Sequence, residues 1–87
     1  MYKYRLDVFK SVGTDFNDGI VEIYEKVGNN YVYVGIALHE AGLYVKVAPN
    51  TIKTYVARAY LENDELGKVY SNYSNELVID TSKETFN

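Results

Sequence analysis

The 87-residue chain contains no cysteine and no tryptophan, and it has one proline and one histidine. Without cysteine it can form no disulfide, thiolate zinc site or cysteine nucleophile. The single histidine, His39, excludes a pair of imidazole metal ligands within one chain, and we interpret it as a solvated loop residue. These absences remove several of the commonest metal and catalytic sites.

A strong excess of charge of one sign is also missing. Nine basic residues stand against twelve acidic ones, which gives a formal charge of −3 and a pI near 5.0. The basic residues are scattered along the chain, and there is no glycine-rich phosphate loop. We therefore expect no nucleic-acid partner.

Long hydrophobic runs are absent as well. The longest nearly apolar stretch, Tyr31 to Leu38, is far shorter than the roughly 20 residues that span a bilayer. Residues Met1 to Val12 mix charged and aromatic side chains, so they lack the apolar core of a signal peptide. We expect neither a membrane span nor a signal peptide in this chain.

Two acidic segments are candidates for chemistry, and each has a simpler explanation. Asp15 to Gly19 resembles the start of a calcium loop, but it is one residue short and Lys26 stands where a bidentate glutamate belongs. Glu62, Asp64 and Glu65 have no apolar flanks that would raise a carboxyl pKa, so a solvated hairpin tip is the better interpretation. We predict a non-enzymatic protein without cofactor or metal.

The residues that are present alternate in the manner of β-strands. Apolar and charged residues alternate from Tyr2 to Phe9, and Ser11 to Gly19 is rich in turn formers. Ile20 to Lys26 and Tyr31 to Ile36 are β-branched and tyrosine-rich runs, and Val27 to Asn30 between them contains Gly28. This pattern predicts a strand, a loop and a β-hairpin.

The second half of the chain continues the same pattern. Leu43 to Val47 alternates and stops before Pro49-Asn50, and a further strand is predicted over Thr54 to Leu61. Glu62 to Glu65 should form a loop, and a last extended region is predicted over Val69 to Tyr73 with Leu77 to Ile79. We found no helical periodicity, internal repeat or linker. We predict one all-β domain over residues 1–87, an antiparallel sandwich or small barrel, with 82–87 as a flexible tail.

Three segments in this order carry a family resemblance. They are Val21 to Gly35, the corner Val47 to Thr51, and the pair formed by Tyr55 to Tyr60 and Tyr73 to Val78. Together they resemble the bacterial variety of fibronectin type III domains over about the last two thirds of the chain. The resemblance implies an immunoglobulin-like antiparallel β-sandwich of about six to seven strands and a binding role.

Several positions depart from the family pattern. The usual core tryptophan is missing, so Phe9 or Val12 should fill its volume, and Lys53 stands at the corner tyrosine position, for which Tyr55 is a substitute. Asn50 replaces the glycine of the corner. Only one strand precedes Ile20 where the family has two, so the first strand is missing or shortened.

A missing first strand would leave the Tyr2 to Phe9 edge open. We hypothesise that another chain, or the tail Ser82 to Asn87, completes this edge by strand addition. The alternative is an edge that is simply short, twisted and solvated.

The chain contains ten tyrosines, more than so small a core can bury, so several rings should lie at the surface. Exposed tyrosine rings are frequent anchors in protein contacts, although tyrosine is also a good strand former and can stack on sugars. The candidate partner-binding residues are Tyr2, Tyr4, Tyr31, Tyr33, Tyr70 and Tyr73.

These observations favour a non-catalytic structural or protein-interaction module. We expect a small structural or decoration protein of a bacteriophage virion, whose partner is a second copy of the chain or a capsid or tail protein. The alternative is an accessory domain of a secreted bacterial glycoside hydrolase or adhesin that contacts carbohydrate. The corresponding location is the virion or the extracellular surface.

Overall fold

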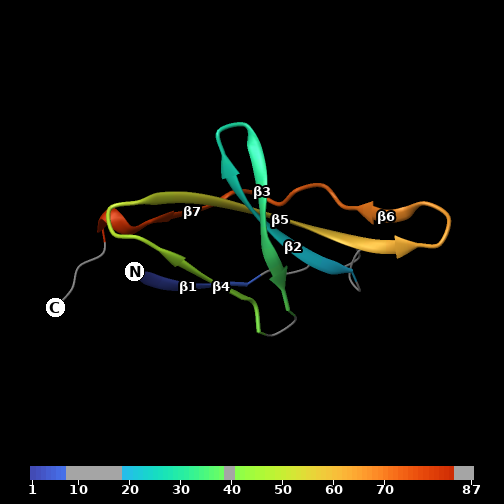
Figure 1. The fold of residues 1–87 in the computed structure, drawn as a ribbon, viewed down its shortest axis with the longest axis horizontal. Coiled ribbons are helices and arrows are strands. Elements are labelled where there is room, and N and C mark those ends of the chain that lie inside the picture. The colour runs from blue at the N-terminus through green and yellow to red at the C-terminus, as the bar shows by residue number, and fades with distance from the viewer. Residues whose placement is uncertain (8–18, 39–40, 84–87) are drawn as a thin grey trace.

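The computed structural model describes residues 1–7, 19–38 and 41–83 (Figure 1). Within these residues the chain forms seven strands and one 3₁₀ turn, which are β1 (Tyr2–Leu6), β2 (Ile20–Val27), β3 (Asn30–Ala37), β4 (Leu43–Val47), β5 (Ile52–Asn63), β6 (Gly67–Tyr70), β7 (Leu77–Asp80) and η1 (Thr81–Lys83). The predicted all-β class is confirmed.

The strands form two antiparallel sheets. The smaller sheet contains β1 and β4, and the larger sheet has the order β3-β2-β5-β6. β5 is so long that two short strands share one of its sides: Ile52 to Tyr55 pairs with β7, and Tyr60 to Asn63 pairs with β6. The larger sheet is thus built around β5.

Both sheets contribute to a single core. The smaller sheet supplies Leu6, Val45 and Val47, and the larger sheet supplies Val21, Ile23, Tyr55, Ala57 and Ile79. Val47 is fully buried. Burial alternates along β1 and β4, as the period of two in the sequence predicts, whereas Val21 to Tyr24 of β2 and Tyr55 to Ala57 of β5 are buried consecutively.

The predicted hairpin is present and is longer than predicted. β2 and β3 pair from Val21↔Ala37 to Val27↔Asn30, and Gly28 takes a φ of 62° in the turn between them. The register shifts once: Ile23 pairs with Gly35 and Tyr24 with Tyr33, so Val34 is an extra residue in β3. Figure 1 shows the hairpin crossing β5, with its tip projecting beyond the rest of the molecule.

Two predicted boundaries need correction. Glu62 and Asn63 belong to β5 rather than to a loop, because Glu62 pairs with Lys68 across the β5–β6 hairpin. The turn follows Asn63, whose side-chain oxygen accepts hydrogen bonds from the backbone N–H groups of Glu65 and Leu66. The last extended region is also not continuous, because residues 71–76 between β6 and β7 are not in a strand.

The corner between β4 and β5 is held by Thr81. Asn50 has a φ of 55°, a conformation that asparagine tolerates in place of glycine. The buried Thr81 hydroxyl donates a hydrogen bond to the Ala48 carbonyl (2.6 Å) and accepts one from the Thr51 N–H (2.9 Å). The end of β7 is thereby tied to the corner.

Other predictions fall on residues that the structure does not describe. Phe9, Val12, His39 and most of the Ser11 to Gly19 segment, with the calcium-like Asp15 to Asp18, lie outside the described residues. Ser82 and Lys83 lie in η1, and the rest of the predicted tail, residues 84–87, is again outside. Lys53 forms an ion pair with Glu25 (3.1 Å), and Tyr55 is buried in the core.

Candidate functional site

The segment between β6 and β7 continues to hydrogen-bond β5 through serine side chains. The Ser71 N–H donates to the Ala59 carbonyl (2.8 Å), and the Ala59 N–H donates to the Ser71 hydroxyl oxygen (2.9 Å). Ser74 repeats the arrangement with Ala57, at 2.7 and 2.9 Å. At both positions a serine hydroxyl replaces the backbone carbonyl that would accept the bond in a regular ladder.

This segment advances three residues for every two residues of β5. Ser71, Ser74 and Leu77 lie opposite Ala59, Ala57 and Tyr55 in turn. In a regular strand, residues three apart point to opposite faces. A period of three instead brings every third side chain to the same side, so that Tyr70 and Tyr73 both reach Arg58 of β5.

Arg58 lies among three tyrosine rings. Its guanidinium carbon is 3.7 Å from the Tyr70 ring centroid, 4.9 Å from that of Tyr73 and 5.1 Å from that of Tyr24. Ser71 and Ser74 lie opposite Ala59 and Ala57, so three residues of this segment cover the length of two residues of β5. Tyr70 and Tyr73 thereby both lie beside the guanidinium of Arg58.

A chain of hydrogen bonds connects Arg58 to a buried carboxylate. Arg58 donates to the Tyr24 hydroxyl from Nε (3.2 Å) and Nη2 (3.1 Å), and that hydroxyl donates to Glu22 Oε1 (2.7 Å). Tyr24 and Glu22 are buried, and Glu22 pairs with Arg58 across β2 and β5. Burial raises the pKa of Tyr24, and its bond to Glu22 raises this pKa further. This chain of hydrogen bonds links the positive Arg58 to the negative Glu22 through a neutral hydroxyl.

Further rings extend this arrangement across the larger sheet. Tyr24 meets Tyr33 edge-on (6.0 Å between ring centroids) and Tyr73 edge-on (5.7 Å), and Tyr31 lies 4.4 Å from Tyr73. We call the set made of Arg58, Tyr24, Tyr31, Tyr33, Tyr70 and Tyr73 the tyrosine face. Its members come from β2, β3, β5, β6 and the segment after β6.

The structure brings together four of the six predicted partner-binding residues. Tyr31, Tyr33, Tyr70 and Tyr73 belong to the tyrosine face, and their exposed fractions lie between 36% and 53%. Tyr2 and Tyr4 lie on β1 in the smaller sheet, where both are half-buried and Tyr4 packs against the core. A partner-binding role for all six stays a prediction.

Sequence reasoning missed the residues that organise this face, namely Arg58, Tyr24, Ser71 and Ser74. A signal for them exists. Residues 70–72 and 73–75 are both Tyr-Ser-Asn, a tandem triplet, which corrects the expectation that the sequence contains no repeat. A period of three is incompatible with a regular strand, so the triplet itself indicates that the strand along this side of β5 is interrupted between β6 and β7.

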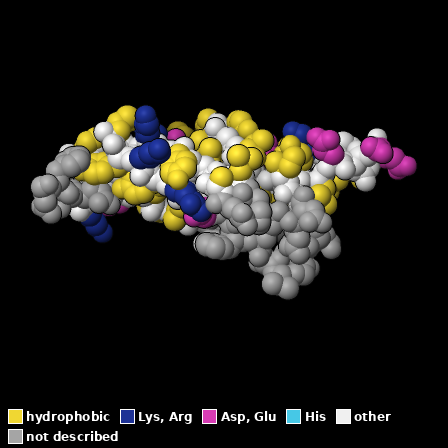
Figure 2. All heavy atoms as spheres, turned by 90° about the horizontal axis from the view of Figure 1, so that it is seen from below, with side chains coloured by type: hydrophobic (Ala, Val, Ile, Leu, Met, Phe, Trp, Pro, Cys, Tyr) yellow, Lys and Arg dark blue, Asp and Glu magenta, His cyan; other side chains and the backbone are white. Residues whose placement is uncertain are grey.

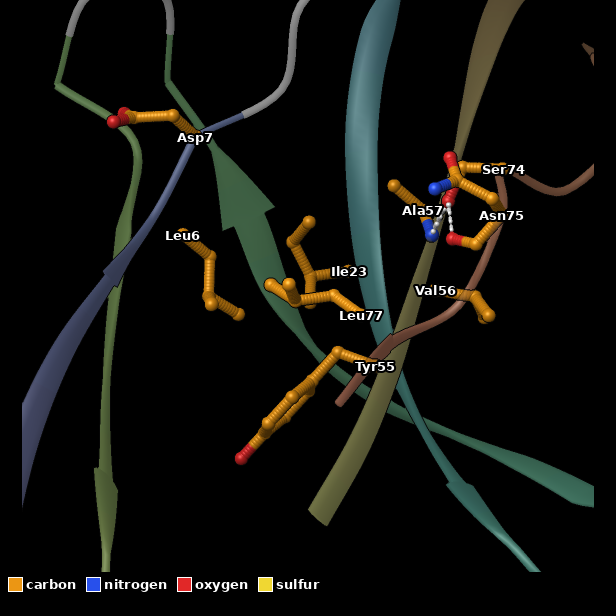
Figure 3. Close-up of a pocket in the computed structure, with 9 residues that line it drawn as sticks. All are labelled: Leu6, Asp7, Ile23, Tyr55, Val56, Ala57, Ser74, Asn75 and Leu77. Atoms are coloured by element: carbon orange, nitrogen blue, oxygen red, sulfur yellow. Dashed lines mark hydrogen bonds between the residues drawn. The ribbon is translucent and has the colours of Figure 1, made fainter. Parts of the chain in front are cut away.

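A pocket of about 280 Å³ opens between the two sheets, on the side flanked by β1 and β7. Figure 3 shows Leu6 of β1 and the side chains of Ile23, Tyr55 and Leu77 directed toward this space. The polar groups in its lining come from Asp7, Ser74 and Asn75. Burial raises the pKa of Tyr55 in this wall. The lining is thus mainly apolar and combines residues of both sheets.

The acidic residues of the β5–β6 hairpin stay apart from this pocket. Glu62, Asp64 and Glu65 are exposed at the β5–β6 hairpin, and Figure 2 shows acidic side chains at that end of the molecule. Across residues 1–7, 19–38 and 41–83, no group of His, Asp and Glu is placed to hold a metal ion. The described part of the chain also contains no helix long and apolar enough to cross a membrane.

No protein-family model matches the chain, and no curated protein or solved structure is significantly similar to it.

Proposed function

We propose that the chain is a non-catalytic protein-interaction module that uses the tyrosine face to bind a protein partner. The observation that carries the proposal is the exposure of four neighbouring tyrosine rings, two of which, Tyr70 and Tyr73, pack against Arg58. Tyrosine and arginine are enriched in the energetically important centres of protein interfaces. Rings that are already packed against one another lose little conformational freedom when a partner binds.

We propose further that the domain is a fibronectin type III-like sandwich in which β1 corresponds to the family's second strand. In that family the second strand pairs with the fifth, and the fourth, third, sixth and seventh strands follow one another in the other sheet. The pairing β1–β4 and the order β3-β2-β5, with β6 and β7 together as the last strand, agree with this scheme. A small structural or decoration protein of a bacteriophage particle is the role that the resemblance favours.

The alternative is a carbohydrate-binding accessory domain. The exposed neighbouring rings of Tyr31 and Tyr73 favour it, because sugars stack on exposed aromatic rings. These rings are inclined by 40°, however, and Arg58 already occupies the space beside Tyr73. They therefore do not form a flat platform for a sugar, and a protein partner fits the surface better.

The test is to purify phage particles produced by the genome that encodes the chain and to quantify the chain in them by mass spectrometry. We expect a fixed number of copies per particle, and loss of the chain when Tyr73→Ser alters the tyrosine face. The matched control is Tyr44→Ser, because Tyr44 is also exposed, at 55% against 36% for Tyr73, but lies on β4 in the smaller sheet. A chain absent from the particles would overturn the phage role. Binding to a polysaccharide array that Tyr73→Ser abolishes would support the alternative.

A further inference from the structure

β3 forms one end of the larger sheet. In the order β3-β2-β5-β6 it pairs with β2 on one side, and no described strand pairs with its other side. It is eight residues long, twice the length of β6 or β7. The outward backbone groups of an edge strand are ready to pair with a strand of another molecule.

β3 lacks the residues that normally prevent such pairing. Of the seven strands described, it alone contains no charged residue, and it contains no proline. Its side chains Tyr31, Val32 and Tyr33 are 41%, 51% and 53% exposed. Natural edge strands of this length usually carry a lysine, another inward or central charge, or a proline.

The charge pattern identifies the partner of this strand. A strand that pairs antiparallel with its own copy places each residue near an identical or neighbouring residue of that copy. On β1 such pairing would bring Lys3 and Arg5 close to their own copies, and on β4 it would do so for Lys46. On β3 it brings only tyrosine, valine and small residues together. β3 is therefore the edge strand best suited to a second copy of this chain.

We propose that two copies of the chain pair through β3, antiparallel, around a twofold axis at Val32. The extra residue at Val34 limits regular pairing to Asn30 through Tyr33, and an axis at Val32 pairs three residues of that stretch, Tyr31, Val32 and Tyr33, with those of the second copy. Tyr31 of each copy then lies opposite Tyr33 of the other copy. Such aromatic cross-strand pairs stabilise antiparallel sheets.

This pairing would also extend the tyrosine face. A twofold axis perpendicular to the sheet keeps the same face of both copies on one side, so the rings of Tyr24, Tyr31, Tyr33 and Tyr73 would continue across the junction. Because the contact is isologous, it closes at two copies and does not form a filament. The inference rests on the proposed function, since it names the partner at one edge of the proposed binding face.

The experiment is light scattering on the purified full chain over about a hundredfold range of concentration. We expect a reversible change from monomer to dimer, because an interface built on one strand pair is small. Val32→Lys should leave only monomer at every concentration, since it places two ammonium groups at the axis. Val32 is half exposed, so the variant should fold, which circular dichroism verifies.

The matched control is Val78→Lys, the same change at a valine of β7 that is 57% exposed, against 51% for Val32. This variant should dimerise like the unaltered chain. A chain that is monomeric throughout, a Val32→Lys variant that still dimerises, a Val78→Lys variant that does not, or species larger than a dimer would each overturn the inference. A monomeric chain found in phage particles would overturn this inference alone and leave the proposed function intact.

Discussion

Arg58 is the residue on which the packing of the tyrosine face depends. It contacts the rings of Tyr24, Tyr70 and Tyr73, and it supplies two hydrogen bonds to the Tyr24 hydroxyl. The same hydroxyl is the hydrogen-bond donor to the buried Glu22. Loss of the guanidinium would therefore remove the ring contacts and leave the Glu22 carboxylate without a nearby compensating cation.

We expect Arg58→Ala to lower the free energy of unfolding by about 1–3 kcal/mol, since each cation–π contact contributes about 0.5–1 kcal/mol and a hydrogen bond about 1 kcal/mol. Urea denaturation measures the change. The control is Lys46→Ala, which removes the same charge from an exposed position on β4 and should change stability by less than about 0.5 kcal/mol. Equal losses in the two variants would contradict a packing role for Arg58.

At the scale of elements, the segment between β6 and β7 acts as a strand whose acceptors are side chains. The Ala57 N–H is the clearest example, because Ala57 is buried and its amide donates to the Ser74 hydroxyl. That hydroxyl in turn donates to the Asn75 carbonyl. Regular backbone pairing does not depend on a particular side chain, whereas the pairing of this segment with β5 depends on the serine hydroxyls.

Ser74→Ala should therefore leave the buried Ala57 N–H without its acceptor, at a cost of about 1–3 kcal/mol. Amide hydrogen exchange followed by NMR should show faster exchange at Ala57 in this variant. Ser74→Thr keeps the hydroxyl and should restore slow exchange. If the Ala57 amide exchanged equally slowly in Ser74→Ala, the hydroxyl would not be its effective acceptor.

The junction between β1 and the turn before β4 offers a second test at this scale. Gly42 has a φ of 69°, and a Cβ there would lie 2.6 Å from the Leu6 carbonyl oxygen. Gly28 has a similar φ of 62°, with no atom within 4 Å of a Cβ. The two glycines share the same backbone requirement and differ in the space around them.

Gly28→Ala should lower the free energy of unfolding by about 1–2 kcal/mol, because the alanine must adopt the left-handed conformation. Gly42→Ala should cost clearly more, since the added methyl group also pushes the end of β1 away from the turn. Thermal unfolding of both variants gives the comparison. Equal costs would show that the Leu6 backbone moves aside freely.

The whole molecule is elongated, with extents of 52 × 28 × 18 Å. Its radius of gyration is 14.5 Å, against about 12 Å for a compact domain of this length. The short extent corresponds to two sheet layers about 10 Å apart. A thin molecule of this kind has a small core, so the buried tyrosines Tyr24 and Tyr55 form a large part of its interior.

This dependence predicts a loss of stability in alkaline solution. Burial raises the pKa of both Tyr24 and Tyr55 in the folded chain, so above about pH 10 the unfolded chain loses these protons first. The free energy of unfolding should then fall as pH rises. Urea denaturation between pH 8 and 11 measures the slope, which Tyr55→Phe should make shallower. A slope unaffected by Tyr55→Phe would exclude Tyr55 as a cause.

The sequence predicts those strands and turns that a local residue pattern determines, and it does not predict which distant segments pair. Period-two alternation predicted Leu43 to Val47 to the residue, and Gly28 marked the hairpin. The division of β5 between β6 and β7 depends on long-range pairing, which alternation within one segment cannot reveal. The number of tyrosines in the composition predicted that several rings are exposed. The position of Arg58 among these rings could not be predicted, because it depends on which strands pair.

The pairing of β1 with β4 has a consequence for the order of assembly during synthesis. About 40 residues separate Tyr4 from its partner Val45, whereas the β2–β3 hairpin joins neighbouring segments. A ribosome adds roughly 5–20 residues per second, so β1 leaves it roughly 2–8 s before β4 exists. During that interval Leu6 has no Val45 or Val47 to pack against. The smaller sheet thus cannot form until β4 has been made, although its first strand is the first to leave the ribosome.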